Sequence, residues 1–354
     1  MSVKYYKSEE SFQFENGACI EELTVSYHTY GTLNAKKDNV VWVCHALTAN
    51  SDVFDWWPGL FGKNELFNPS EYFIVCANVL GSHYGTTNPL SINPTTGHSY
   101  YLDFPQFTIR DIVSVNQRLA DHLGIHSIEI LIGGSLGGQQ VLEWVAAESI
   151  HINKLIVIGS SAQASPWGIA FNESQRLAIA ADPSFFSNQV DGGANGLKAA
   201  RSMALLSYRN YQTYSKTQEE SDANKSDSYK AASYQQYQGE KLVKRFNAYS
   251  YWYLTKAMDS HHLGRNRASV AKTLQAFQTE TLVIGIPTDV LFPASEQEFI
   301  ADNIPGASYY ALNSFYGHDG FLIETKTLTD VIGKFLDRSV KKKIKTVKEQ
   351  LTNL

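Results

Sequence analysis

The sequence predicts an α/β fold with a mostly parallel central sheet, and two features of the chain support this. Short apolar runs bounded by turn residues recur along it: Asn39–Leu47, Tyr72–Leu80, Ser127–Ile132, Lys154–Ser161, Thr281–Ile286 and Ala307–Ser314. Most are rich in Val and Ile and lack clean polar alternation, which is typical of strands covered on both faces. Helix-like stretches, such as Thr108–Leu123 and Ser295–Asn303, lie between several of them, and this alternation favours helices layered against a sheet.

One interval departs from this alternation. Residues 166–272 are polar, tyrosine-rich and helix-like, with few strand candidates. The simplest arrangement is a helical cap inserted into an α/β core that comprises residues 1–165 and 273–354. Within the cap, residues 215–230 are nearly free of apolar side chains, which predicts an exposed loop or a mobile segment. The basic tail, residues 340–354, is expected to be a solvated helix end.

Composition narrows the functional classes. The 354 residues are 43% hydrophobic and carry a formal net charge of −5, which gives no reason to expect nucleic acid or an anionic membrane as a partner. The N-terminus lacks the apolar core of a signal peptide, and no apolar run approaches the roughly 20 residues that span a bilayer. The three cysteines are far apart and odd in number, so we expect free thiols in the cytoplasm. No zinc-ligand spacing, P-loop or dinucleotide fingerprint is present, and we expect neither a metal nor a cofactor.

The segment GGSLGGQQVLEW, residues 133–144, crowds four glycines around Ser135. It follows a strand-like run and leads into a helix-like stretch. Gly-x-Ser-x-Gly at a strand-to-helix junction is typical of a nucleophile elbow, in which a serine occupies a sharp, strained turn. The alternative is a glycine-rich turn with an incidental serine.

A serine hydroxyl needs a base, usually a histidine oriented by a carboxylate. Asp289 follows the strand-like run Thr281–Ile286, and His318 follows the next such run between two glycines. The order Ser, Asp, His is the one that elbow-bearing folds use, and loops after strand carboxyl ends build active sites. Ser135, Asp289 and His318 are therefore the predicted catalytic residues.

An oxyanion hole would need backbone N–H groups. The residue after the nucleophile, Leu136, should supply one of them. Leu47, in the segment CHALTAN at residues 44–50, is the candidate for the second. We interpret the neighbouring Cys44 and His45 as packing or loop-shaping residues rather than a reactive pair.

Several long motifs give the chain a family resemblance. In chain order they read CHALTAN, NVLGSHYGTTNP, FPQFTIRDIV, GGSLGGQQVLEW, YQGEKLVKRFNAYSYWYLTKAMD and YGHDGFLIE. They resemble the homoserine O-acyltransferases of the α/β-hydrolase superfamily, and the similarity runs from about residue 10 to 338. The resemblance implies an α/β-hydrolase fold and transfer of an acyl group, usually acetyl and sometimes succinyl, from coenzyme A to L-homoserine. It implies ping-pong use of Ser135, cytoplasmic methionine biosynthesis and a homodimer formed through the cap.

The resemblance also implies residues that bind the acceptor. Arg201 matches the family arginine for the homoserine carboxylate, and Tyr208 lies seven residues further on. Arg209 competes with Arg201 for this role. Asp319, directly after the histidine, matches the residue expected to face the acceptor's amino group.

The chain departs from the family pattern at three places in the cap. Asn247 and His262 stand where the family commonly has aspartate, and residues 215–230 differ in composition. Because the cap shapes the substrate tunnel, we expect these differences to bear on acyl-chain choice more than on the chemistry.

Three other functions fit the sequence less well. An esterase or thioesterase would use the same residues on water, but a cap favours transfer because it limits water. A non-catalytic protein could keep the fold, although every predicted catalytic residue is present. The same chemistry with L-serine as acceptor fits the sequence best of the three.

Overall fold

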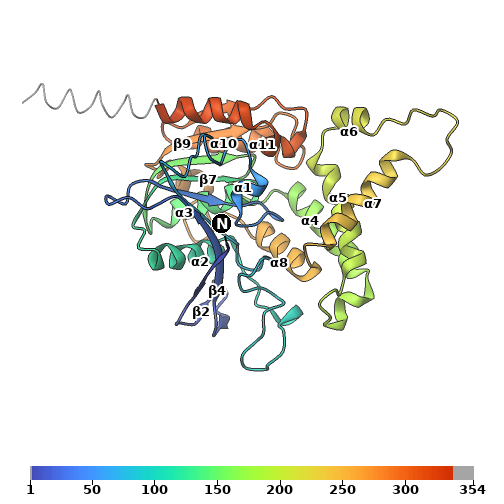
Figure 1. The fold of residues 1–354 in the computed structure, drawn as a ribbon, viewed down its shortest axis with the longest axis horizontal. Coiled ribbons are helices and arrows are strands. Elements are labelled where there is room, and N and C mark those ends of the chain that lie inside the picture. The colour runs from blue at the N-terminus through green and yellow to red at the C-terminus, as the bar shows by residue number, and fades with distance from the viewer. Residues whose placement is uncertain (1, 338–354) are drawn as a thin grey trace, which may run out of the picture.

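The computed structural model describes residues 2–337. Its core is an eight-stranded sheet in the order β1-β4-β6-β5-β7-β8-β9-β10 (Figure 1). The strands are β1 (Lys4–Lys7), β4 (Thr24–Tyr30), β5 (Val40–Cys44), β6 (Phe73–Ala77), β7 (Ser127–Gly134), β8 (His151–Ile158), β9 (Glu280–Gly285) and β10 (Ser308–Ala311). The six strands from β6 to β10 in the sheet order are parallel, whereas β4 pairs antiparallel with β6 and β1 antiparallel with β4. The predicted α/β class with a mostly parallel sheet is confirmed.

Each of the six predicted apolar runs overlaps one parallel strand. The antiparallel edge was not expected, and neither was the small hairpin of β2 (Phe12–Gln13) and β3 (Cys19–Ile20). The reason lies in composition. β4 reads TVSYHTY, and its buried Ser26 and His28 contact the hydroxyls of the loop residues Thr86 and Ser51. It therefore shows neither an apolar run nor a clean alternation.

Both faces of the sheet are covered, which explains why the strands lack polar alternation. Trp42 and Leu131 point to one face and pack with α2 (Ile109–His122), α3 (Leu136–Ala147) and α10 (Ala294–Asn303). Their strand neighbours Val41 and Ile130 point to the other face, towards α1 (Val53–Trp56), α11 (Gly320–Ile323) and the helical residues 325–337. Successive residues of a strand alternate between faces, so two apolar layers require continuous apolar runs.

Between β8 and β9 the chain is helical. The elements are α4 (Pro166–Ala180), the 3₁₀ turn η2 (Pro183–Ser187), α5 (Ala194–Tyr208), α6 (Tyr211–Thr217), α7 (Lys230–Val243), α8 (Ala248–Asp259) and α9 (Val270–Gln275). Figure 1 shows α4, α5, α6 and α7, in green to yellow, standing to one side of the sheet. We refer to residues 166–272 as the cap. The proposed cap boundary at residue 272 falls inside α9.

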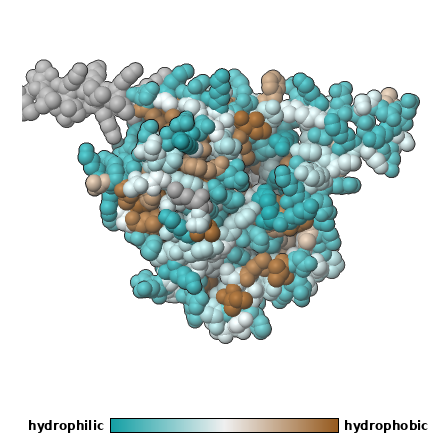
Figure 2. Space-filling view, in the orientation of Figure 1, coloured by the Kyte–Doolittle hydropathy of each residue, from teal (hydrophilic) through white to brown (hydrophobic). Residues whose placement is uncertain are grey.

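The polar segment at residues 215–230 is mostly exposed (Figure 2). Its first residues, 215–217, end α6, and its last residue begins α7. The expectation of a loop is therefore correct only for residues 218–229. The basic tail, residues 340–354, lies outside the described residues. In the part of the chain from residue 2 to 337, no helix is long and apolar enough to cross a membrane.

An ion-pair network ties the end of the cap to the core. Glu143 of α3 is buried and receives both terminal nitrogens of Arg267, at 3.1 and 2.6 Å. The Nε of Arg110 lies 3.1 Å from the same carboxylate. Glu15 in turn pairs with Arg110 at 3.0 Å and with Arg265 at 2.7 Å. The chain that returns from the cap to β9 is thus held against α2, α3 and the N-terminal segment.

Candidate active site

Ser135 occupies a strained turn between β7 and α3. Its φ and ψ are 58° and −125°, a region that costs a residue with a side chain about 1–3 kcal/mol. Hydrogen bonds on both sides hold the turn. The Ser135 N–H donates to the carbonyl of Ile158 at 3.0 Å, and the Ser160 hydroxyl donates to the Ser135 carbonyl at 2.8 Å. The strand-to-helix elbow that the sequence predicts is present.

Close backbone approach explains the glycines around this serine. A Cβ on Gly133 would lie 2.3 Å from the carbonyl oxygen of Gly137, across the turn. A Cβ on Gly137 would lie 2.0 Å from the carbonyl oxygen of Cys44, at the end of β5. Glycine therefore allows the first turn of α3 to lie directly against β5, and this brings the loop after β5 to Ser135.

Asp289 and His318 meet after β9 and β10. The imidazole Nδ1 of His318 lies 2.6 Å from Oδ2 of Asp289, and both side chains are buried. The other carboxylate oxygen, Oδ1, accepts hydrogen bonds from the N–H groups of Leu291 at 2.8 Å and Phe292 at 2.9 Å. Burial alone would lower the pKa of His318, but the Asp289 carboxylate, with a contribution from Asp319, outweighs it and raises this pKa above its ordinary value. The pair can therefore accept a proton at Nε2 and stabilise the resulting imidazolium.

Aromatic rings enclose the imidazole of His318. Ring centroids of Phe292, Phe321 and Tyr208 lie 5.3, 5.5 and 5.8 Å from it. Gly317 has a φ of 60°, and a Cβ there would lie 2.9 Å from the backbone of Arg209 at the end of α5. The cap thus packs directly on the turn that carries His318.

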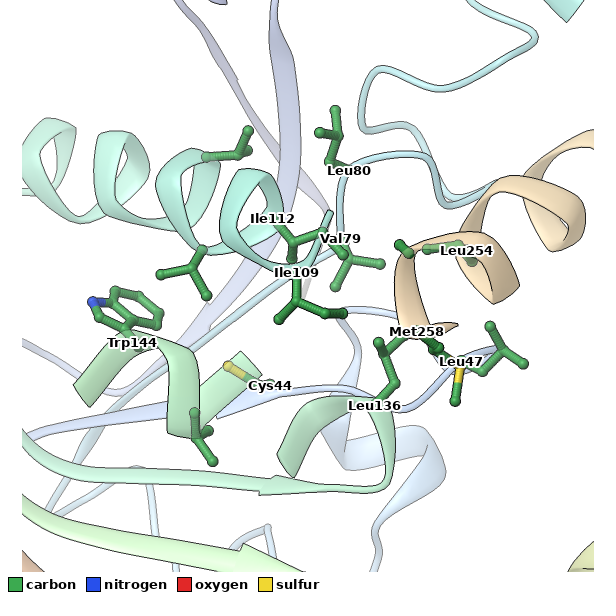
Figure 3. Packing of buried hydrophobic residues seen from close by; sticks show 14 of the residues in the cluster. Cys44, Leu47, Val79, Leu80, Ile109, Ile112, Leu136, Trp144, Leu254 and Met258 are labelled. Carbon is green, nitrogen blue, oxygen red and sulfur yellow. The ribbon is translucent and has the colours of Figure 1, made fainter. Parts of the chain in front are cut away.

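The two backbone amides predicted for an oxyanion hole are free to donate. Among residues 2–337, neither the Leu47 nor the Leu136 N–H has an acceptor. Leu136 begins α3, where the helix leaves its first N–H groups unpaired. Figure 3 shows Leu47 and Leu136 close together, with Met258 of α8 beside them.

Buried side chains hydrogen-bond to the backbone of the loop after β5 and of its neighbour after β6. Gln140 of α3 donates to the carbonyl of His45 at 3.2 Å. His45 is buried, its Nδ1 contacts the carbonyl of Ala46, and its Nε2 accepts the Val79 N–H at 3.1 Å. Burial lowers the pKa of His45 to about 4 and raises that of the Cys44 thiol. The geometry agrees with a loop-shaping role for His45 and a packing role for Cys44.

A pocket of about 510 Å³ opens at Ser135 and His318. Leu47, Arg201, Tyr208 and Asp319 also line it, whereas Leu136 does not and presents only its backbone near Ser135. The guanidinium of Arg201 lies 5.3 Å from the Tyr208 ring centroid. In the described part of the chain, Arg201 has no carboxylate partner. Burial raises the pKa of Tyr208, so that its hydroxyl stays neutral.

Arg209 and Asp319 form an ion pair beside the pocket. Nη1 of Arg209 lies 2.5 Å from Oδ2 of Asp319, and Nη2 donates to the hydroxyl of Tyr234 at 3.4 Å. Arg209 does not line the pocket. The structure thus separates the two arginines that the sequence left in competition: Arg201 faces the cavity, and Arg209 faces Asp319.

Sequence reasoning did not single out several residues that line the pocket. They include Lys241 and Arg245 near the end of α7, and Thr48, Asn50 and Tyr84 from loops after β5 and β6. Lys241 lies in the last turn of α7 and Arg245 two residues beyond the end of the helix. No signal in the sequence indicated that either cation faces a pocket, because charged residues at a helix end are usually solvated.

The three departures from the family pattern do not line this pocket. Asn247 accepts the Ser250 N–H at 2.7 Å as the N-cap of α8, and its amide contacts Nδ1 of His83 at 2.8 Å in a neighbouring, smaller pocket. His262 is exposed, and residues 218–229 lie at the far end of the cap. The expectation that these positions act on acyl-chain choice finds no direct contact to support it.

The chain matches a known protein family and curated relatives. Residues 39–325 match the family model described as the alpha/beta hydrolase fold, the class that the sheet order and the serine elbow define. A homoserine O-acetyltransferase from Cyclobacterium marinum is 46% identical over 335 residues, which are 95% of this chain and 95% of that protein.

Solved structures also resemble this chain. A homoserine O-acetyltransferase from Staphylococcus aureus is 29% identical, with a TM-score of 0.79 over 95% of each chain. Esterase E22, at 23% identity, has a TM-score of 0.86 over 95% of this chain and 99% of its own, which shows the shared fold alone. The chain belongs to the homoserine O-acetyltransferase family of α/β-hydrolase-fold enzymes.

Proposed function

We propose that this enzyme transfers the acetyl group of acetyl-CoA to the hydroxyl of L-homoserine through an acetyl-Ser135 intermediate. The observation that carries the proposal is one pocket lined by the strained Ser135, by His318 with its Asp289 partner, and by Arg201. Among the residues that the structure describes, Arg201 has no carboxylate partner and can receive one from a substrate. Family membership, at 46% identity to a homoserine O-acetyltransferase, supports the choice of acceptor and acyl group.

In the first half-reaction, Ser135 Oγ attacks the thioester carbonyl while Nε2 of His318 takes its proton. The oxyanion that forms would accept hydrogen bonds from the N–H groups of Leu47 and Leu136. The C–S bond then breaks, and the imidazolium returns the proton to the CoA thiolate. Asp289 keeps Nδ1 protonated throughout and stabilises the imidazolium.

In the second half-reaction, His318 takes the proton of the homoserine hydroxyl as its oxygen attacks the acetyl-serine carbonyl. Collapse of the tetrahedral intermediate releases O-acetylhomoserine and returns the proton to Ser135. The two substrates use one nucleophile in turn, so ping-pong kinetics are expected.

The acceptor would be held by its two charged ends. Arg201 would pair with the carboxylate, for which a guanidinium offers a bidentate geometry. Asp319 would receive the ammonium while it keeps its contact with Arg209, because a carboxylate accepts several hydrogen bonds. The ammonium would therefore complete an existing charge pair rather than meet an isolated anion.

Thiol release from purified protein tests the proposal. Acetyl-CoA or succinyl-CoA is supplied as donor, with L-homoserine, L-serine or no acceptor. We expect release that depends on acetyl-CoA and L-homoserine together and that is lost in Ser135→Ala. Equal release without any amino acid would make the enzyme a hydrolase, and preference for succinyl-CoA or L-serine would change the donor or the acceptor.

A further inference from the structure

Three cations without a carboxylate partner among residues 2–337 line the pocket that holds Ser135. Arg201, Lys241 and Arg245 all face it, against two carboxylates, those of Asp55 and Asp319. Asp319 is already paired with Arg209. The chain as a whole has a net charge of −5, so this excess of positive charge runs against the average of the molecule.

The three cations lie at different levels of exposure. Arg201 is half-buried and contacts the ring of Tyr208, which in turn lies beside His318. Lys241 and Arg245 are exposed, in and just beyond the last turn of α7. The inner cation is thus suited to a small acceptor near the imidazole, and the outer two to a charged group at the pocket mouth.

Lys241 has no anionic partner within residues 2–337. The adjacent Glu240 points elsewhere, since its carboxylate pairs with Lys198 at 2.7 Å. A lysine at a helix C-terminus is favoured by the helix dipole, and this explains its position in the sequence. The dipole does not explain why this side chain faces the cavity.

Arg245 joins the cap to the core at the same place. Its Nη1 donates to the Thr48 carbonyl at 2.6 Å and to the Tyr84 hydroxyl at 2.5 Å. Thr48 follows Leu47 in the loop after β5. None of these partners is charged, so within residues 2–337 no carboxylate offsets the positive charge of Arg245.

We propose that Lys241 and Arg245 form the subsite for the phosphate groups of the acyl-CoA donor. The inference rests on the proposed function, because it takes the donor to be a CoA thioester. Coenzyme A carries a diphosphate and a 3′-phosphate, and paired flexible and planar cations suit such a multiply charged anion. Arg245 would also couple donor binding to the loop that carries Leu47.

The test compares two acetyl donors. Acetyl-CoA carries the phosphates, and S-acetyl-N-acetylcysteamine presents the same thioester without them. We expect Lys241→Gln to lower kcat/KM for acetyl-CoA about fivefold, as for loss of one exposed charge contact. The same variant should show little loss of kcat/KM with the phosphate-free donor.

The double variant Lys241→Gln/Arg245→Gln should lower kcat/KM for acetyl-CoA further. Added salt should lower kcat/KM for acetyl-CoA more in the wild type than in this double variant, because salt screens the charge contacts that the variant lacks.

Lys244→Gln is the matched control. Lys244 is also exposed at the end of α7, but it lines the neighbouring pocket of His83 and Asn247. Removal of its charge should leave the ratio of the two donors unchanged. The subsite would be overturned if Lys241→Gln lowered kcat/KM equally for both donors. It would also be overturned if Lys244→Gln changed the ratio of the two kcat/KM values as much as Lys241→Gln does.

A binding measurement separates this inference from the proposed function. Calorimetry with CoA and Ser135→Ala protein requires no turnover. We expect Lys241→Gln in this background to raise the Kd for CoA about fivefold. An unchanged Kd, or no binding of CoA at all, would overturn the subsite, whereas CoA binding without homoserine-dependent turnover would count only against the proposed function.

Discussion

Replacement of Asp289 by asparagine should disable His318 through its tautomer rather than through its position. Oδ1 of Asp289 accepts two backbone N–H groups, from Leu291 and Phe292. An amide with its NH₂ at that place would leave two buried donors unsatisfied, at about 1–3 kcal/mol each. The orientation that keeps the amide oxygen at this place is therefore more stable than the flipped one by at least about 2 kcal/mol, which is a roughly thirtyfold preference.

This orientation directs the NH₂ of the introduced asparagine side chain at Nδ1 of His318. Nδ1 must then accept a hydrogen bond, so the proton moves to Nε2, the nitrogen that the proposed mechanism uses as its base, and Nε2 can no longer accept a proton. The imidazolium also loses the carboxylate that raises the pKa of His318. In serine triads this change lowers kcat by roughly 10⁴-fold, or about 5 kcal/mol of barrier.

Single-turnover thiol release with acetyl-CoA and no acceptor measures the affected step. Asp289→Asn should slow this burst about 10⁴-fold and move its acidic limb to lower pH, while circular dichroism shows a folded protein. Asp319→Asn is the matched control, since Asp319 pairs with Arg209 and not with the imidazole; its main effect should be on KM for L-homoserine. A burst within tenfold of wild type in folded Asp289→Asn would refute the orienting role of Asp289.

Four further predictions concern other parts of the chain. Gly137→Ala should lower the free energy of unfolding by about 3 kcal/mol or more in urea denaturation, because its Cβ meets a carbonyl oxygen of β5 at 2.0 Å. Gly168→Ala, in α4 with no atom nearer than 3.5 Å, should be neutral or stabilising, and equal losses in the two variants would contradict the clash. Arg201→Lys should raise KM for L-homoserine about tenfold or more while burst release of CoA from acetyl-CoA persists; an unchanged KM would remove Arg201 from the acceptor site. Burial raises the pKa of Glu296 to about 7 from 4.5, so the folded state binds its proton more tightly and loses stability as the pH rises from about 4.5 to 7. The melting temperature of Glu296→Gln relative to wild type should accordingly be higher at pH 8 than at pH 5, and the reverse order would be inconsistent with a buried carboxyl. The family resemblance implies a homodimer formed through the cap, where Leu206 of α5 is 59% exposed; light scattering should find that dimer and Leu206→Glu should weaken it, and a wild-type monomer would contradict the implied interface.

Local patterns were sufficient for the parallel strands and the serine elbow. The apolar runs predicted six strands because both faces of the sheet are covered, so no alternation is needed. Four glycines around Ser135 predicted a sharp turn, since only close backbone approach makes such a cluster useful. Asp289 and His318 were predicted from chain order and from their place after strands, and the structure brings the two side chains together.

Two features, the burial of β4 and the choice between Arg201 and Arg209, depend on contacts between residues far apart in the chain. β4 is buried although four of its seven residues are polar, because loop residues far along the chain, such as Thr86, hydrogen-bond to it. The choice between Arg201 and Arg209 depends on Asp319, which lies 110 positions beyond Arg209 in the chain and pairs with it only in the folded state.

The sequence by itself predicted the fold class and the strained turn, which the structure shows, and it named the candidate catalytic side chains, since these follow from local periodicity, backbone sterics and motif order. Only the tertiary structure decided which cations face the pocket and which carboxylate Arg209 neutralises. The physical reason is that a side chain's charge and hydrogen-bonding capacity are known from its type, whereas the partner that uses them depends on which distant segments the fold brings within about 3 Å.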